Sequence, residues 1–462
     1  MLPDDVLLAI FRFYIKGDEF TKKGIEVWQL LVHVCQRWRS VVFGSPRHLN
    51  LQLYCTPRTS RDMLDAWPAL PLVVVWPALP PEVTCYGPRP DTDNVDAVLE
   101  HSDRVRRINF HFDFILQADK VWAAMKEPFP ELENLELSST DAEQVIPDSF
   151  LGGSAPRLQY IGLWGTPFPG LPKLLLSASH LVTLLYSRIP HSGYVSPEAL
   201  VTGLSRAASL NMLSLKFRSL DSHPGPESRR PLPPTRTVLP ALTSFDFIGA
   251  IEYLEDLVTR IDAPRLDDFQ IHISIPSNLD APQLVQFISR TPTLKAHDKA
   301  HVCIGDGAVK VVLLSTGHDR ATLSIENLIW GSNIQLPWLA RVTSSLPSLP
   351  MAESLYIYGH HYFQDWEPEV QVENTEWLDL LRPYTAVKNL YLSDVFGPKV
   401  MCALQGSVGE TTTVVLPTLQ TVFMEGLQPS GPVQEEIGQF VAARQLSGYP
   451  CAISLWKDVH KL

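Results

Sequence analysis

The residues with the spacing closest to a metal site are His297 and His301. In His297-Asp-Lys-Ala-His301 the two imidazoles would share one helical face, as they do in zinc proteases. A zinc protease also needs a glutamate beside the first histidine and a third ligand, and here Asp298 takes the glutamate position. We favour the interpretation that both histidines are exposed to solvent at the edge of a repeat. The sequence therefore predicts no metal site.

Other catalytic patterns are absent from the sequence. It contains neither a Gly-x-x-x-x-Gly-Lys-Ser/Thr phosphate loop nor a Gly-x-Ser-x-Gly nucleophile elbow. Glu252, Glu255 and Asp256 cluster on a predicted helix, where acidic residues usually face solvent, and His360-His361 is expected at a loop tip. We therefore expect no catalytic residues, no cofactor and no enzymatic activity.

Composition bounds the kind of protein and its partners. Hydrophobic residues make up 45% of the 462 residues and charged residues 19%, which predicts a folded chain. The net charge of −12 would repel the phosphate backbone of a nucleic acid, so we expect no nucleic-acid partner. Apolar runs such as Leu72–Trp76 are too short to span a membrane, so no membrane partner is expected. Six scattered cysteines without a Cys-x-x-Cys pair indicate reduced thiols in an intracellular protein of the cytoplasm or nucleus.

A short phrase recurs through most of the chain: an apolar residue, two variable residues, an apolar residue, one variable residue, an apolar residue. Most neighbouring copies start about 24–35 residues apart, and blurred copies are expected in the larger gaps near 181–185 and 294–313. This period and phrase indicate degenerate leucine-rich repeats. The copies begin at Val105, Leu132, Leu158, Leu210, Leu242, Leu266, Ala352, Val387 and Leu419.

The segments between the phrases carry helical periodicity, so each repeat is predicted to be a strand followed by a returning helix. Neither element can bury its apolar face until the next repeat stacks on it. An unrelated α/β fold with similar buried strands is the alternative. Helices are expected over 96–100, 197–208, 251–261, 281–290, 377–382 and 435–444, a last strand over 452–456, a loop over 223–237 and an insertion over 397–413.

The N-terminal residues predict two amphipathic helices. Pro3 suits a first helical turn, and Asp4 and Asp5 place negative charge at the positive end of the helix dipole. A second apolar face repeats at helical spacing from Val27 to Val41. Two such helices in fewer than fifty residues cannot bury their apolar faces against each other alone, so they need a partner.

These segments resemble the F-box of a large group of fungal, basidiomycete-type proteins. The resemblance rests on Leu-Pro followed by aliphatics ending in Ile-Phe, and on the Trp28 to Leu51 run with its Val-Cys-x-x-Trp core. It implies docking onto the Skp adaptor of a Skp–cullin–F-box ubiquitin ligase. The docking positions it implies are Leu2, Pro3, Leu7, Ile10, Phe11, Val34, Cys35 and Trp38.

Two features depart from that family. The segment 16–25 is longer and more charged than the usual link, and the chain begins at the motif itself, so a truncated start is one explanation. The alternative is that the helices simply cap the next domain. The expected fold is thus α/β: an all-helical F-box-like domain over 1–50, a Pro-rich connecting segment over 51–100, and a leucine-rich-repeat-like solenoid over 101–462.

The variable positions of the phrase are expected on the face of the sheet away from the helices, where a protein target would bind. Aromatic side chains with a polar end are favoured at interfaces, although strand tyrosines also pack against one another across repeats. The function expected is substrate recognition for the ligase, and the alternative is a repeat scaffold without ligase association. The candidate target-binding residues are Tyr160, Trp164, Tyr356, Tyr358, Tyr391 and Phe423.

Overall fold

The computed structural model divides the chain into two compact units, Met1–Val195 and Ser196–Leu462. The residues that it describes are 2–16, 27–45, 48–49, 51–55, 61–67, 70–76, 93–112, 118–140, 144–219, 235–273, 281–295, 297–305, 308–315, 322–328, 335–347, 349–359, 373–406, 415–425 and 432–456.

The first unit begins with a helical module made of α1 (Asp4–Lys16), α2 (Val27–Val32) and α3 (Gln36–Gly44). The single helix predicted from Val27 onward is wrong, because the chain breaks between α2 and α3. Cys35 begins the new helix, since its Sγ accepts the backbone N–H of Trp38 at 3.4 Å. Inside the module, Phe11 is fully buried with its ring centroid 4.7 Å from that of Trp38.

The rest of the first unit is a parallel sheet in the order β1-β2-β3-β4-β5-β6. The predicted connecting segment 51–100 is wrong as a separate part, because it supplies the first strands of this sheet and their helices. The strands are β1 (Leu53–Cys55), β2 (Leu72–Trp76), β3 (Val105–His111), β4 (Asn134–Ser138), β5 (Tyr160–Trp164) and β6 (Thr183–Ile189). The helices between them are α4 (Arg61–Ala66), α5 (Asp93–Leu99), α6 (Ala118–Ala124), η2 (Phe150–Gly153), α7 (Leu171–Ser177) and η3 (His191–Gly193).

Register explains why the repeat phrase builds this sheet. Ile108, Leu135, Ile161 and Leu184 lie side by side on successive strands, and all are buried beneath the helices. Full burial of a side chain of this size contributes about 1.5–3 kcal/mol. The blurred copy expected near 181–185 is confirmed, since β6 pairs in parallel with β5.

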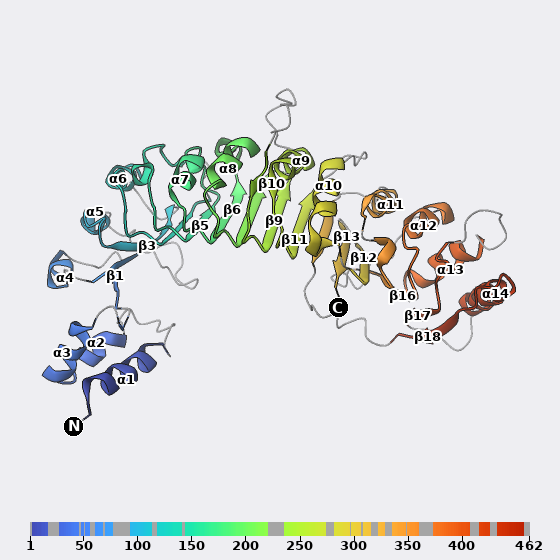
Figure 1. The fold of residues 1–462 in the computed structure, drawn as a ribbon, viewed down its shortest axis with the longest axis horizontal. Helices are drawn as coiled ribbons and strands as arrows, with labels where there is room; N and C mark the ends of the chain where they lie inside the picture. The colour runs from blue at the N-terminus through green and yellow to red at the C-terminus, as the bar shows by residue number, and fades with distance from the viewer. Residues whose placement is uncertain are drawn as a thin grey trace, which may run out of the picture. The chain divides into compact units, whose positions relative to one another are not determined.

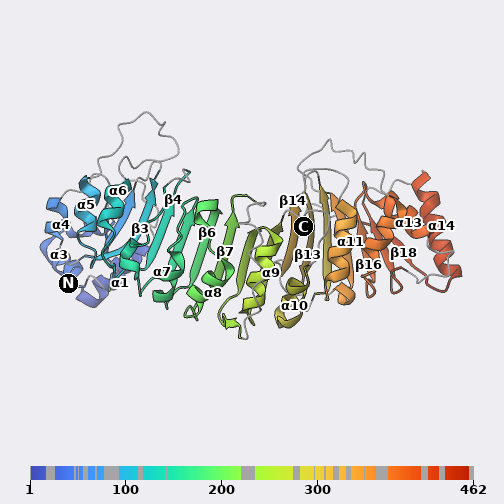
Figure 2. The ribbon, with the colours of Figure 1, turned by 90° about the horizontal axis from the view of Figure 1, so that it is seen from above.

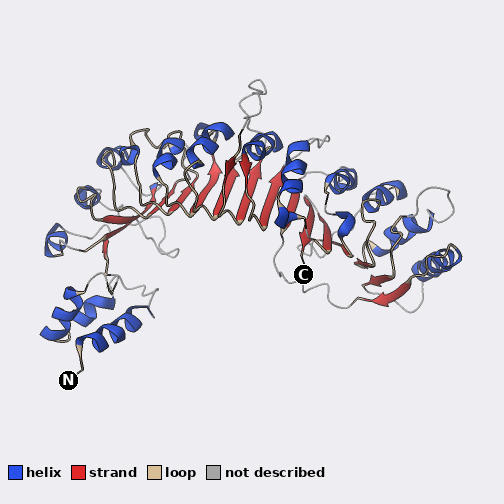
Figure 3. Ribbon diagram, viewed as in Figure 1, coloured by secondary structure: helices blue, strands red, loops and turns tan. Residues whose placement is uncertain are grey.

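The second unit has the same strand–helix plan in the order β7-β9-β11-β14-β13-β12-β15-β16-β17-β18, with a small β8–β10 pair beside it. In each unit the helices that connect successive strands lie on one side of the strands (Figures 1 and 3). The strands are β7 (Met212–Phe217), β8 (Thr237–Val238), β9 (Ser244–Gly249), β10 (Ile261–Asp262), β11 (Asp268–Ile273), β12 (Lys299–Gly305), β13 (Ala308–Leu314), β14 (Leu323–Leu328), β15 (Ser354–Gly359), β16 (Asn389–Leu392), β17 (Thr421–Met424) and β18 (Ala452–Leu455). The helices are α8 (Pro197–Leu204), α9 (Ile251–Arg260), α10 (Pro282–Arg290), η4 (Pro292–Leu294), α11 (Gln335–Ser345), η6 (Leu349–Met351), α12 (Asn374–Leu381), α13 (Gly397–Gly406) and α14 (Pro432–Leu446).

The second unit departs from a simple repeat at β12–β14. The strand that follows α10, β12, does not pair with β11 but with β15. Between β12 and β11 lie the antiparallel strand β13 and then β14, which pairs with β11. The blurred repeat copy expected over 294–313 is confirmed in part: β12 pairs in parallel with β15, whereas β13 is an additional antiparallel strand. Both β12 and β14 keep the direction of the repeat strands, so the parallel order continues on either side.

The helices predicted for the repeats are confirmed, whereas the insertion predicted over 397–413 contains a regular helix of the repeat. The structure places α13 within the insertion expected over 397–413, while most of the loop expected over 223–237 lies outside the described residues. Glu255, expected to face solvent, instead accepts the backbone N–H groups of Gln283 and Leu284 at the start of α10. A carboxylate there satisfies free N–H groups and interacts favourably with the helix dipole. Among the described helices, none combines the length and apolar content that crossing a membrane requires.

Candidate functional site

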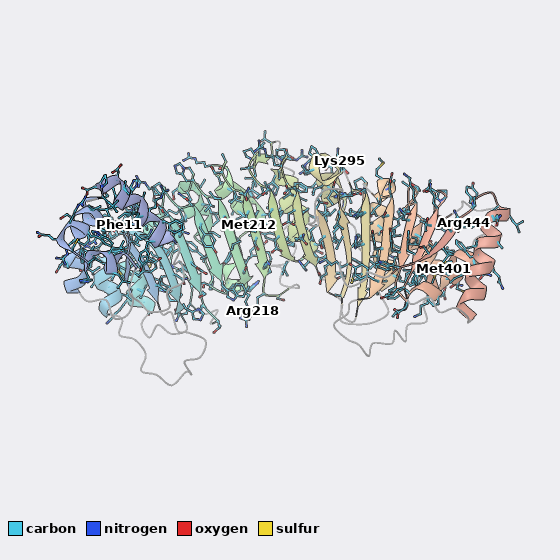
Figure 4. The ribbon with its side chains drawn as sticks, turned by 90° about the horizontal axis from the view of Figure 1, so that it is seen from below. Phe11, Met212, Arg218, Lys295, Met401 and Arg444 are labelled. Carbon is cyan, nitrogen blue, oxygen red and sulfur yellow. The ribbon has the colours of Figure 1, made fainter. Side chains whose placement is uncertain are left out.

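The face of each sheet that the helices leave uncovered carries the variable positions of the repeat phrase. In β15 the side chains of Leu355 and Ile357 are buried, whereas those of the alternating residues Tyr356 and Tyr358 are partly exposed. Met212, labelled in Figure 4, lies on this open face of β7 and is also exposed. The prediction that these positions point away from the helices is confirmed.

An aromatic ladder crosses the open face of the second unit. We use this name for the rings of His301, Tyr356, Tyr391 and Phe423, which occupy paired positions on β12, β15, β16 and β17. Successive ring centroids lie 4.3, 4.2 and 4.4 Å apart, with interplanar angles of 15°, 7° and 7°. Pairing in register brings side chains of adjacent strands to stacking distance. The ladder is thus a continuous stack that four separate strands build.

The stack determines what the ladder can offer a partner. Because each inner ring is covered on both faces by its neighbours, the ladder presents ring edges and hydroxyl groups to solvent. The buried ring of Trp456 packs edge-on against Tyr356 and Tyr391, at centroid distances of 6.0 and 5.6 Å. Burial, followed by the neighbouring Tyr391 and its side-chain hydrogen bond, raises the pKa of Tyr356. The ladder therefore suits hydrogen bonding and edge contacts with a protein surface.

The two histidines of the metal-like spacing do not share a helical face. His301 lies in strand β12 and His297 lies just before it, so the segment is not helical. Both are buried, so the interpretation as solvent-exposed histidines is wrong as well. Burial lowers the pKa of each imidazole to about 4, and both are therefore neutral near pH 7. Within the described residues, no cluster of three His, Cys, Asp or Glu side chains could hold a metal ion.

Beyond the ladder, on β7 to β13, the same open face is polar. Lys216 Nζ lies 2.5 Å from Asp246 Oδ2 on the neighbouring strand. Farther along, Glu326 Oε2 lies 3.2 Å from His272 Nδ1 and 3.7 Å from Lys310 Nζ. These groups largely satisfy one another, so they fit the polar margin of an interface better than a catalytic cluster.

The predicted target-binding residues are not all brought together. Tyr358 joins the ladder, since its ring meets that of His301 edge-on at 6.0 Å. Tyr160 and Trp164 lie instead on β5 of the first unit, where the Arg188 guanidinium stands 6.0 Å from the Trp164 ring centroid. The C-terminal candidates thus form one surface, while the two on β5 belong to a separate compact unit.

The predicted docking residues of the helical module divide into exposed and buried groups. Leu2, Ile10 and Val34 are 52%, 47% and 59% exposed, and Pro3 and Cys35 are also exposed. Leu7 and Phe11 are buried within the module, and Trp38 is half-buried against Phe11. The buried residues hold the helices together, and only the exposed ones can meet a partner directly.

Several functional candidates were not predicted. Val6 and Phe13 extend the exposed apolar surface of α1, and Phe13 is 83% exposed. The spacing of Val6, Ile10 and Phe13 at i, i+4 and i+7 in the sequence already indicates one helical face. His301 and Trp456 had no such signal, because their places in the ladder depend on the pairing of distant strands.

Comparisons with known proteins add little to the geometry. No protein-family model matches this chain, and no curated protein matches it. Among solved structures, the leucine-rich repeat-containing protein LegL7 of Legionella pneumophila matches with 13% identity and a TM-score of 0.30, over 76% of this chain and 91% of that chain. The assignment as a leucine-rich-repeat-like α/β solenoid therefore rests on the repeat phrase and the parallel strands themselves.

Proposed function

We propose that this chain is the substrate-recognition subunit of a Skp–cullin–F-box ubiquitin ligase. In this proposal the helical module docks onto the Skp adaptor, and the open face of the repeats binds a protein target. The chain itself catalyses nothing; it brings the target close to the ubiquitin-loaded enzyme of the ligase, and proximity accelerates the transfer.

The observation that carries the proposal is an exposed apolar surface that we call the docking stripe: Val6, Ile10 and Phe13 on α1, and Leu2 just before the helix. Three large apolar side chains in solvent on one helical face, with a fourth beside its start, mark a surface that a partner covers. A module that only capped the repeats would bury this face, whereas its buried residues are Leu7, Phe11 and others on the inner side.

The module is also fixed firmly to the first strand. The buried Trp28 Nε1 donates to the backbone oxygen of Gln52, 3.1 Å away and just before β1. The Trp28 ring also meets those of Phe43 and Trp67, with centroids 6.2 and 5.6 Å away. These contacts hold the helical module in one position on the first strand of its own unit.

The aromatic ladder is the proposed contact for the target. Its hydroxyls and ring edges, beside the edge-on Trp456, combine apolar contact area with hydrogen-bonding capacity, as interface aromatics do. Tyr391→Phe is the mildest test of this role, because it keeps the ring stack and removes a single hydroxyl.

The proposal is tested by co-purification of the full chain with the Skp adaptor. We expect stoichiometric capture by the native chain and loss of capture by Ile10→Glu combined with Val34→Glu, which add charge at exposed positions without disturbing the core. Met351→Glu is the matched control, since Met351 is 68% exposed in the second unit. Trp38→Ala should also abolish capture, but because Trp38 packs on Phe11 it acts partly by loosening the module.

The alternative function is a repeat scaffold that binds proteins without a ligase. The ladder and the polar open face support this function equally, because neither depends on the docking stripe. A well-folded native chain that captures no Skp adaptor would leave the scaffold as the function and would contradict the ligase proposal.

A further inference from the structure

The first described strand, β1, and the last, β18, differ in what lies at their outer edges. At β1, the first strand, Leu53 and Cys55 are each only 1% exposed, and Trp28 of the helical module is bonded to the adjoining backbone. At β18, the last strand, no described strand pairs along the outer edge, since its sheet partner is β17. Figure 2 shows β18 and α14 as the last described elements at the red end of the second unit.

At β18, the buried apolar residues beneath the helices have no further strand beside them to complete their packing among the described residues. Leu355, Leu390 and Val422 occupy one such row on successive strands and are fully buried, whereas Ile453, next in register, is partly exposed. Leu455 is 47% exposed, although Met424, its partner on β17, is buried. In a stacked repeat array each repeat completes the core of the one before it. The last repeat has no described successor to do so.

Backbone hydrogen-bonding groups of β18 also point to its outer edge, away from β17. The N–H groups of Ala452 and Trp456 donate to the oxygens of Gln420 and Met424 at 2.8 Å, so these residues face β17. Alternate residues of a strand direct their backbone groups to opposite edges, so those of Ile453 and Leu455 point to the outer edge. Monomeric proteins usually guard such an edge with a charge, a proline or a bulge. The sequence Ala-Ile-Ser-Leu of β18 contains neither a charge nor a proline.

The stretch of sequence that contains β18 carries no charged residue. From Gln445 to Trp456 the sequence has no Asp, Glu, Lys, Arg or His, in a chain whose net charge is −12. Within this run Leu446 is 90% exposed and Tyr449 is also exposed. Two copies of an acidic chain repel each other through most of their surfaces, but they can meet here without burying unpaired charge.

We propose that the outer edge of β18 is a self-association site, at which two copies of this chain pair β18 with β18 in antiparallel orientation. A strand that meets its own copy about a two-fold axis is self-complementary, because each residue contacts the equivalent surface of the partner. The pairing satisfies the outward backbone groups of Ile453 and Leu455, and the flanking Leu446 and Tyr449 add apolar contact. This dimer does not depend on the proposed ligase function.

Sedimentation equilibrium of the full chain tests the proposal. We expect a concentration-dependent mass approaching twice the 51.7 kDa of one chain. Leu446→Lys combined with Leu455→Lys should weaken the dimer by about tenfold or more, because like charges then face each other across the two-fold axis. Leu446 is 90% exposed and Leu455 47% exposed, so neither lies in the core and the fold should tolerate the change. Met351→Lys, at an apolar position that is 68% exposed, should leave the dimer intact.

Hydrogen exchange gives the second readout. In the dimer the amides of Ile453 and Leu455 should be protected, and the protection should disappear on dilution and in the double variant. A native chain that is monomeric at every concentration would overturn the proposal. A dimer that Phe13→Lys disrupts while the double variant leaves it intact would also overturn it, since the copies would then meet through the docking stripe. Protection of these amides only when another protein is bound would replace self-pairing with strand addition by that protein.

Discussion

Replacing the central tyrosine of the aromatic ladder should loosen the strands that it joins. Tyr391 stacks on Tyr356 and Phe423, with ring centroids 4.2 and 4.4 Å away, and it meets Trp456 edge-on at 5.6 Å. An aromatic contact of this kind contributes about 0.5–1.5 kcal/mol beyond the area it buries. Three such contacts make the expected cost of Tyr391→Ala about 3 kcal/mol, in addition to the lost apolar area.

Phe423→Ala is the matched comparison. Phe423 stacks on Tyr391 and ends the ladder, because its neighbour in register on β18 is Ser454. Phe423→Ala therefore removes one ring contact, which should lower the free energy of unfolding by about 1 kcal/mol. The two alanine variants should then differ in this free energy by about 2 kcal/mol. Tyr391→Phe keeps every ring contact and should cost less than about 1 kcal/mol.

Hydrogen exchange of strand amides can measure this difference locally. In Tyr391→Ala, the amides of β16 and β17 should exchange about 30-fold faster than in Phe423→Ala, which is the equivalent of 2 kcal/mol. Amides of β4 in the first unit should not change, because repeat arrays transmit stability between neighbouring repeats. Equal effects of the two alanine variants, or a Tyr391→Phe effect as large as that of Tyr391→Ala, would refute the stacking account.

Two further predictions concern stability. Since His297 and His301 have folded-state pKa values of about 4, below the ordinary 6.5, the unfolded chain binds protons between pH 6.5 and 4 that the folded chain does not. The free energy of unfolding in urea should therefore fall with decreasing pH across this window, by up to about 1.4 kcal/mol per pH unit for each histidine. His301→Phe should keep the stack and reduce that slope, and an unchanged slope would contradict the assignment. Gly165 has φ +67°, and an added Cβ would lie 2.1 Å from the backbone oxygen of Ser139, so Gly165→Ala should cost at least about 3 kcal/mol in urea unfolding. Gly44→Ala, with open space around the new Cβ, should be close to neutral and serves as its control.

The strand content of the fold was predictable because the repeat phrase encodes alternation. Apolar residues two positions apart, such as Leu355 and Ile357, fix which side of a strand is buried. Strand direction was not predictable at β13, because Val309, Val311 and Leu313 alternate in the same way in an antiparallel strand. Periodicity alone reports the buried face and carries no information about the partner strand.

The break between α2 and α3 was hidden for a related reason. Apolar spacing continues from Leu31 through Val34 to Trp38, so the pattern predicts one helix. The break depends on a local contact, the Cys35 Sγ accepting the N–H of Trp38, that periodicity does not contain. At the ladder, the sequence placed Tyr356, Tyr391 and Phe423 on one face, but only the strand register made them a stack.

The docking stripe and the aromatic ladder lie in different compact units, so their roles should be separable. Ile10→Glu changes a side chain in solvent on α1 and should leave exchange at β16 unaltered while it abolishes adaptor capture. Tyr391→Ala should do the reverse, because the ring contacts it removes all lie within the second unit. A target that still binds Ile10→Glu but not Tyr391→Ala would identify the ladder as the recognition surface. Loss of adaptor capture in Tyr391→Ala would instead show that the adaptor contacts the repeats, and the division of labour between stripe and ladder would be wrong.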